Sequence, residues 1–137
     1  MDSSPKVFSV EEANQLLGQV APLLQQLQGL QQSIARTNQE LDEAVGKLSQ
    51  GNGYPVKEIQ QRVSELTQHQ LNLIEAFQSA LQQLENLGCL LKDLNTGLVD
   101  FYSMRSGELV FLCWKVGEEM IQFWHGLEDG FSGRQPL

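Results

Sequence analysis

Residues 97–116 read GLVDFYSMRSGELVFLCWKV, and this stretch predicts a β-hairpin. Two runs rich in β-branched and aromatic residues flank an Arg-Ser-Gly turn signal. A two-residue turn at Ser106-Gly107 places Asp100 opposite Cys113 on the neighbouring strand. Because side chains alternate between the faces of a sheet, one face of the hairpin is apolar and the other carries Asp100 and Cys113.

A third strand is predicted over residues 120–125, after the connection Gly117-Glu118-Glu119. If the connection holds those three residues, His125 shares a face with Asp100 and Cys113. If it holds two or four residues, His125 joins the apolar face instead, because a shift of one residue turns every side chain over. The sequence leaves both registers open.

The sequence before residue 89 predicts two long helices, 8–50 and 54–88, which fold back on each other. Apolar residues recur at alternating spacings of three and four along both helices, which is a heptad pattern. A kink is expected near Gly18-Pro22, because proline removes a backbone donor. Each seam has one polar member, Thr37 and Gln70. These fall in adjacent layers of an antiparallel hairpin, which favours that pairing.

These elements predict an α+β protein: a long antiparallel two-helix, coiled-coil-like hairpin with a three-stranded antiparallel sheet at its open end. Residues 1–137 are expected to form a single domain, in which 89–137 is the β-unit with its C-terminal tail. A capping box of Ser9 and Glu12 would begin the first helix. A single heptad seam buries little apolar surface per residue, so we expect the chain to pair into a homo-oligomer, a dimer.

The composition excludes several classes of partner. The chain has 17 Asp and Glu residues against 9 Lys and Arg, and its formal net charge is −8. Binding to nucleic acid requires clustered basic residues, and an anionic membrane surface would repel an acidic protein. No apolar run approaches the length of a membrane span, and the N-terminus lacks a signal-peptide pattern. Two cysteines suggest no disulfide framework, so we expect a cytoplasmic protein.

Several short motifs near the C-terminus form a specific signature: GLVDF (97–101), LCW (112–114), GE (117–118), WH (124–125), GF (130–131) and RQPL (134–137). Together with the opening Phe8…Glu12-Ala13-Asn14, this signature resembles an uncharacterised bacterial and archaeal family described as a domain of unknown function. The resemblance implies a helical hairpin with a small β-unit, and it brings no assigned activity.

Four residues in this region are candidate metal ligands: Asp100, Cys113, Glu118 and His125. Thiolate, imidazole and carboxylate groups suit zinc or iron. None of the usual metal-binding spacings, such as CxxC or HExxH, is present. The simpler interpretation is a buried Cys113 and a His125 that hydrogen-bonds to a carboxylate. A thiolate–imidazolium pair for nucleophilic catalysis is a weaker alternative, because nothing in the sequence marks an oxyanion hole.

A second hypothesis is a binding pocket in the β-unit, formed by Asp100, Glu118, Trp124, His125 and Arg134. Arginine suits carboxylates and phosphates, so a small anionic ligand or a protein partner is the expected occupant. The alternative is an internal ion pair of Arg134 with Glu118 or Asp129 that holds the C-terminus in place. No catalytic residues are assigned.

The sequence alone therefore does not decide between two possible functions. The first is a non-enzymatic binding or assembly module without a cofactor, which self-associates through its hairpin and presents the polar and aromatic pocket. The second is a small metalloprotein or metal-dependent enzyme that uses Asp100, Cys113, Glu118 and His125.

Overall fold

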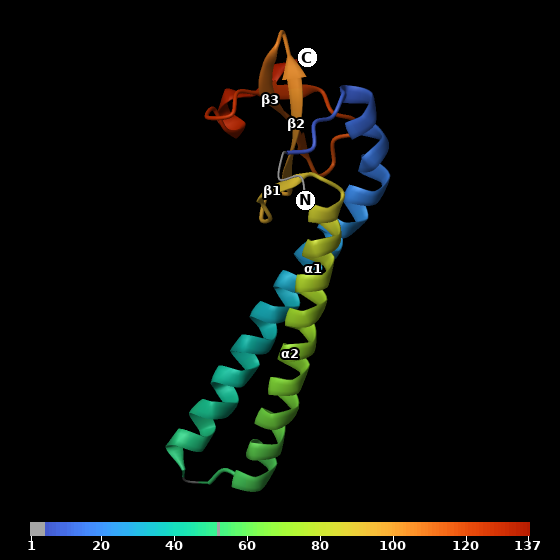
Figure 1. Ribbon diagram of the computed structural model, residues 1–137. Helices are drawn as coiled ribbons and strands as arrows, with labels where there is room; N and C mark the ends of the chain where they lie inside the picture. The colour runs from blue at the N-terminus through green and yellow to red at the C-terminus, as the bar shows by residue number, and fades with distance from the viewer. Residues whose placement is uncertain (1–4, 52) are drawn as a thin grey trace. The chain divides into compact units, whose positions relative to one another are not determined.

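The computed structural model describes residues 5–51 and 53–137, and the chain forms two compact units within them (Figure 1). Residues 5–28 and 80–137 make up the first unit, and residues 29–79 make up the second. The elements follow in the order α1 (Val10–Gln50), α2 (Val56–Asn86), β1 (Leu90–Asp93), β2 (Leu98–Arg105), β3 (Glu108–Lys115), β4 (Phe123–His125), a 3-10 turn (Phe131–Gly133) and β5 (Gln135–Pro136).

The first helix begins at the predicted capping box. The Ser9 hydroxyl accepts a hydrogen bond from the Glu12 backbone N–H at 3.1 Å, and the Glu12 carboxylate accepts one from the Ser9 N–H at 2.8 Å. These reciprocal bonds satisfy two donors that a helix leaves free at its start, and they lower the pKa of Glu12. Pro22 lies inside α1, and the kink expected there stays a prediction. The second helix begins at Val56, two residues after the predicted start.

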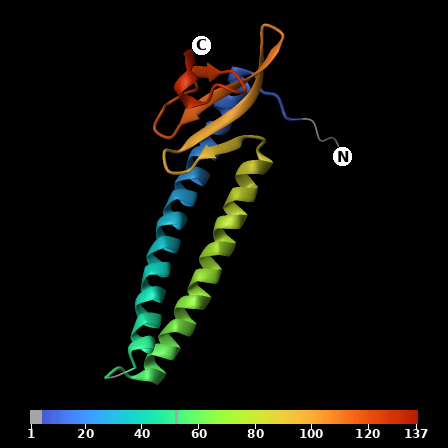
Figure 2. The ribbon, with the colours of Figure 1, turned by 90° about the vertical axis from the view of Figure 1, so that its left-hand side faces the viewer.

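The second unit contains the C-terminal part of α1 and the N-terminal part of α2, and these segments run antiparallel side by side (Figures 1 and 2). Thr37 and Gln70 are both buried here. The Gln70 amide donates to the Ile34 carbonyl at 3.0 Å and to the Asn38 side chain at 2.7 Å. The buried Gln70 amide nitrogen therefore finds two acceptors on the opposite helix, whereas its Oε1 has no partner among the described residues. The predicted helical hairpin is confirmed.

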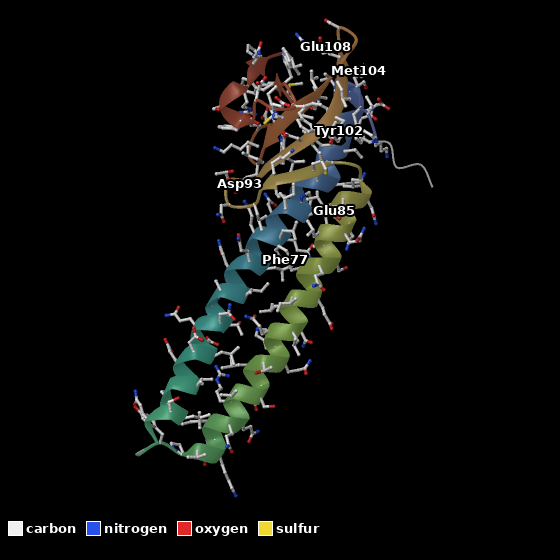
Figure 3. All side chains as sticks on the ribbon, turned by 60° about the vertical axis from the view of Figure 1, so that its left-hand side comes forward. Phe77, Glu85, Asp93, Tyr102, Met104 and Glu108 are labelled. Carbon is white, nitrogen blue, oxygen red and sulfur yellow. The ribbon has the colours of Figure 1, made fainter. Side chains whose placement is uncertain are left out.

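The sheet lies in the first unit and is an antiparallel meander of five strands in the order β1-β2-β3-β4-β5. The prediction of three strands was wrong, because β1 and β5 hold only four and two residues and carry too few side chains to show a pattern. The α+β class is confirmed. Figure 3 labels Met104 and Glu108 near the tip of the β2–β3 hairpin and Asp93 toward the other end of the sheet.

The β2–β3 hairpin has the predicted register. Arg105 pairs with Glu108, and Asp100 pairs with Cys113. Ser106 and Gly107 have φ angles of 53° and 79°, so both central residues of the turn are left-handed. A turn of this type matches the right-handed twist of the flanking strands, which explains why two residues suffice.

The third predicted strand is shorter than expected, although its register is the one that a three-residue connection gives. Phe111 pairs with His125, but β4 begins only at Phe123. The preceding segment makes other bonds: the Trp114 indole donates to the Glu118 carbonyl at 2.9 Å, and Ile121 N–H donates to the Asn14 side chain at 2.7 Å. Through these hydrogen bonds, residues 116–122 are attached to α1 and to Trp114 on the apolar face of the sheet, so they do not continue β4.

The core of the first unit lies between one face of the sheet and the N-terminal part of α1, which runs along that face (Figure 2). The sheet side chains there are buried, and Phe8 packs edge-on against Phe101 with ring centroids 5.4 Å apart. The buried apolar residues on the two sides are Val99, Phe101, Val110, Leu112 and Trp114 from the sheet, and Ala13, Leu17, Val20 and Leu24 from α1. Among the described residues, no helix is both long and apolar enough to cross a membrane.

Candidate functional site

The opposite face of the sheet carries a buried polar cluster formed by Asp100, Cys113 and His125. Asp100 lies on β2, Cys113 lies directly opposite it on β3, and His125 follows on β4. The pairing register of the strands and the alternation of side chains along each strand place all three side chains on one face. Each of the three residues is at most 3 % exposed. Three neighbouring strands, rather than a loop, therefore position these groups.

Hydrogen bonds define the orientation of the His125 ring. Its Nδ1 lies 2.8 Å from the carbonyl oxygen of Gly126, and its Nε2 lies 3.0 Å from Asp100 Oδ2. A carbonyl oxygen can only accept, so Nδ1 carries the proton and Nε2 faces Asp100 and Cys113. One ligand atom from each of the three residues, including Cys113 Sγ, lies within 4.8 Å of the other two. The group is compact enough for one ion to contact all three side chains.

Burial changes the protonation of the cluster. Desolvation raises the pKa of the Asp100 carboxyl, although the neighbouring His125 and Cys113 act in the opposite direction. Desolvation and the nearby Asp100 charge raise the pKa of the Cys113 thiol to about 11. A nucleophilic cysteine needs a lowered pKa instead. The cluster therefore does not have the electrostatics of a cysteine nucleophile, which was the weakest sequence hypothesis.

A cavity of about 230 Å³ adjoins the cluster, and Asp100, Cys113 and His125 line it. Its other walls come from β1, β2, β3 and the loop after β4. The Lys92 ammonium lies 4.3 Å from the centroid of the Phe111 ring, which is part of the wall. The remaining lining residues are Leu98, Leu127, Glu128, Gly130 and Phe131.

Glu118 and Arg134 bind each other and do not line this cavity. Their side chains are 2.6 Å apart, and the Glu118 carboxylate also accepts the Lys115 backbone N–H at 2.7 Å. Arg134 donates to the Cys113 carbonyl at 3.3 Å, and its guanidinium lies 4.1 Å from the centroid of the Phe123 ring. The predicted internal ion pair of Arg134 with Glu118 is confirmed, and it joins the C-terminal segment to β3.

Trp124 belongs to a different surface. It pairs with Leu112 on β3, so its side chain lies on the other face from that of His125. The Arg105 guanidinium lies 4.8 Å from its ring centroid. Of the residues predicted for the ligand pocket, the structure brings Asp100 and His125 together in the cavity. It places Glu118, Trp124 and Arg134 elsewhere.

The cavity walls, in particular Lys92, Leu127 and Phe131, were not predicted from the sequence. Lys92 lies on a four-residue strand that carried no clear pattern. The glycines at 126 and 130 mark the loop after His125 as irregular, and that was the available signal that the chain could fold over the polar face. Which side chains of the loop meet the cluster depends on its path, which the sequence does not specify.

The fold and site define a class: an α+β protein with a helical hairpin, a five-stranded antiparallel sheet and a buried Asp-Cys-His group that could hold a metal ion. The chain belongs to the uncharacterized conserved protein family DUF2203, whose family model matches residues 6–137. The membership expected from the C-terminal signature is thereby confirmed. No curated protein and no solved structure matches the chain at a significant level.

Proposed function

We infer that this protein binds one divalent transition-metal ion, zinc or iron(II), through Asp100, Cys113 and His125. The observation that carries the proposal is the convergence of three different ligand types, all buried, within 4.8 Å of one another. They come from three adjacent strands and border a cavity. Thiolate, imidazole and carboxylate are the ligands that zinc most often uses.

Charge balance supports a divalent ion at this place. An ionised Asp100 and Cys113 carry two negative charges, and a neutral His125 adds none. A divalent cation makes the site neutral, which removes most of the cost of burying ionised groups. Without the ion, protonation of Asp100 and Cys113 neutralises the site, in agreement with the raised pKa values of both groups. Metal binding would therefore displace protons from the cluster.

The geometry of His125 also supports a metal. Metal-ligating histidines commonly donate their second ring N–H to a carbonyl or carboxylate, and this bond fixes the tautomer. The contact of Nδ1 with the Gly126 carbonyl has this form and leaves Nε2 as the ligand atom. Tetrahedral zinc bonds imply ligand atoms about 3.3 to 3.6 Å apart. The 3.0 Å separation of Nε2 from Asp100 Oδ2 needs to widen by only a few tenths of an ångström.

The number of ligands indicates the kind of metal site. Structural zinc sites use four protein ligands, whereas catalytic sites use three and complete the shell with water or substrate. Within the described residues, the group holds three members, and Glu118 is bound by Arg134 instead. We therefore place this protein among those whose metal takes an exogenous ligand. A small anionic ligand, one of the occupants expected for the predicted binding pocket, would then bind at the metal rather than in a pocket with Trp124.

The chain provides matched controls for the test, because it has two cysteines and two histidines. Metal content is measured by elemental analysis and native mass spectrometry on tag-free protein. We expect about one zinc or iron per chain, lost in Cys113→Ser and His125→Gln. The controls Cys89→Ser and His69→Gln should keep the metal, since Cys89 bonds to the Leu84 carbonyl and His69 is exposed.

Circular dichroism of each variant shows whether the helices persist. If the wild-type protein is free of metal after purification and takes up none from added zinc or iron(II), the proposal is wrong. It is also wrong if all four variants lose the metal equally, because the bound ion would then not depend on the cluster.

A further inference from the structure

The cavity beside the cluster has walls of two kinds. Its sides are apolar and come from Leu98, Phe111, Leu127 and Phe131. Its charged lining residues outside the cluster are Lys92 and Glu128, and both are exposed. A molecule in the cavity therefore meets the three candidate metal ligands on one side, apolar carbon atoms around it, the Lys92 ammonium and the Glu128 carboxylate.

Lys92 is held close to the cluster. Its ammonium lies 4.3 Å from the centroid of Phe111, within the range of a cation–π contact. Lys92 also lines the same cavity as Asp100, Cys113 and His125. A cation on this lining can pair with an anion that is bound beside Asp100 on the metal.

The ion itself does not favour a multiply charged ligand. With Asp100 and Cys113 ionised, a divalent metal site is neutral, and Lys92 is the only cation among the residues that line the described cavity. Glu128 on the same lining repels a second negative charge. A single negative charge on a body that is otherwise apolar matches these surroundings.

We propose that the cavity binds a small aliphatic monocarboxylate, whose carboxylate occupies the exogenous position on the metal and pairs with Lys92 while its chain packs against Leu98, Leu127 and Phe131. This proposal rests on the proposed metal site and adds the chemical class of the ligand. Carboxylate oxygens are suitable ligands for both zinc and iron(II). The volume of about 230 Å³ accommodates a short chain.

The test uses cobalt(II), whose visible spectrum changes with its ligands and whose thiolate bond gives a near-ultraviolet charge-transfer band. The full-length protein is loaded with cobalt(II) and titrated with acetate, butyrate, butyramide and chloride. We expect a saturable change in the visible spectrum with butyrate, about tenfold tighter than with acetate, because butyrate buries two more methylene groups. Butyramide and chloride should bind far more weakly, since one lacks the charge and the other lacks the chain.

Variants separate the contributions of charge and apolar contact. Lys92→Gln should weaken butyrate binding about threefold to fivefold, the size expected for an exposed ion pair. Lys57→Gln, an exposed lysine on α2, should leave it unchanged. Leu127→Ala should reduce the advantage of butyrate over acetate without changing acetate itself. Glu128→Gln should tighten butyrate binding while cobalt is retained, whereas loss of cobalt would make Glu128 a fourth ligand and contradict the proposal.

The outcomes distinguish this proposal from the one on which it rests. A thiolate charge-transfer band with a visible spectrum that butyrate does not change would overturn the carboxylate proposal and leave the metal site standing. An equal response to acetate, butyrate and chloride would also overturn it, because any open cobalt site behaves in that way. Absence of the thiolate band would overturn the metal site, and the ligand proposal with it.

Discussion

Arg134 shows how single side chains connect the C-terminal segment to the site. It reaches the Glu118 carboxylate and the Cys113 carbonyl, and it lies over the rings of Phe123 and Phe131. Its side chain is only 13 % exposed, so the charges of this pair are largely removed from water. When intact, such a buried pair contributes little more to the free energy of unfolding than apolar residues in its place would. Removal of one partner, however, leaves an uncompensated buried charge.

Replacement of Arg134 by Met should therefore lower the free energy of unfolding by about 2 kcal/mol, because Glu118 loses its partner while much of the apolar contact is kept. Urea unfolding followed by tryptophan fluorescence measures this change, since Trp114 and Trp124 both lie in the first unit. The control is Arg62→Met, which removes an exposed pair with Glu40 at 3.6 Å and should change the free energy by less than about 1 kcal/mol. Equal effects of the two variants would show that the Arg134 pair contributes no more than a surface contact.

Part of the site could be predicted from single residues. Asp100 lies opposite Cys113 because a two-residue turn fixes which residues of the two strands pair with each other. The position of His125 could not be settled, because the connection before it is bonded through Glu118 and Ile121 rather than as a regular hairpin loop. The role of Lys92 depends on packing between residues distant in sequence, which a local pattern does not encode.

At the scale of elements, the turn between β1 and β2 positions the Asp100 strand. Gly97 has a φ of 74°, and a Cβ atom built there would collide with the Val116 side chain. Gly107 in the β2–β3 turn has a similar φ of 79° but open space around it. Both positions thus require a left-handed backbone, but only at Gly97 would a side chain also collide with a neighbour.

Gly97→Ala should destabilise the first unit by about 3 kcal/mol, which combines the cost of a left-handed alanine with that of overpacking. Gly107→Ala carries only the backbone cost and should lower stability by about 1 kcal/mol. Thermal or urea unfolding of the two variants, followed by tryptophan fluorescence, provides the comparison. A larger effect at Gly107 than at Gly97 would contradict the packing described for Val116.

Elements were predictable where their patterns are long. The helices carry heptad spacing over many turns, and the β2–β3 hairpin has strands of eight residues each. The edge strands β1 and β5 form because they pair with longer neighbours, and their own sequences have no clear alternation. These two strands therefore depend on the rest of the sheet and could not be predicted from their own residues.

At the scale of the molecule, the proposed ion should stabilise the folded first unit, because its ligands come together only when the sheet forms. Zinc at a free concentration 100 times its dissociation constant should add about 2.7 kcal/mol, which raises the melting temperature by on the order of 10 °C. Differential thermal melting of wild-type protein with zinc and with a chelator measures the shift, and Cys113→Ser should show little of it. The homodimer expected from the heptad seam stays a prediction.

The measurement that tests the central claim most directly is X-ray absorption spectroscopy of the zinc-loaded protein at the zinc edge. The account predicts about one sulfur neighbour near 2.3 Å together with nitrogen and oxygen neighbours near 2.0 Å, including the imidazole signature of His125. The sulfur shell should disappear in Cys113→Ser and persist in Cys89→Ser. A zinc shell made only of nitrogen and oxygen in the wild-type protein would contradict the Asp100-Cys113-His125 site.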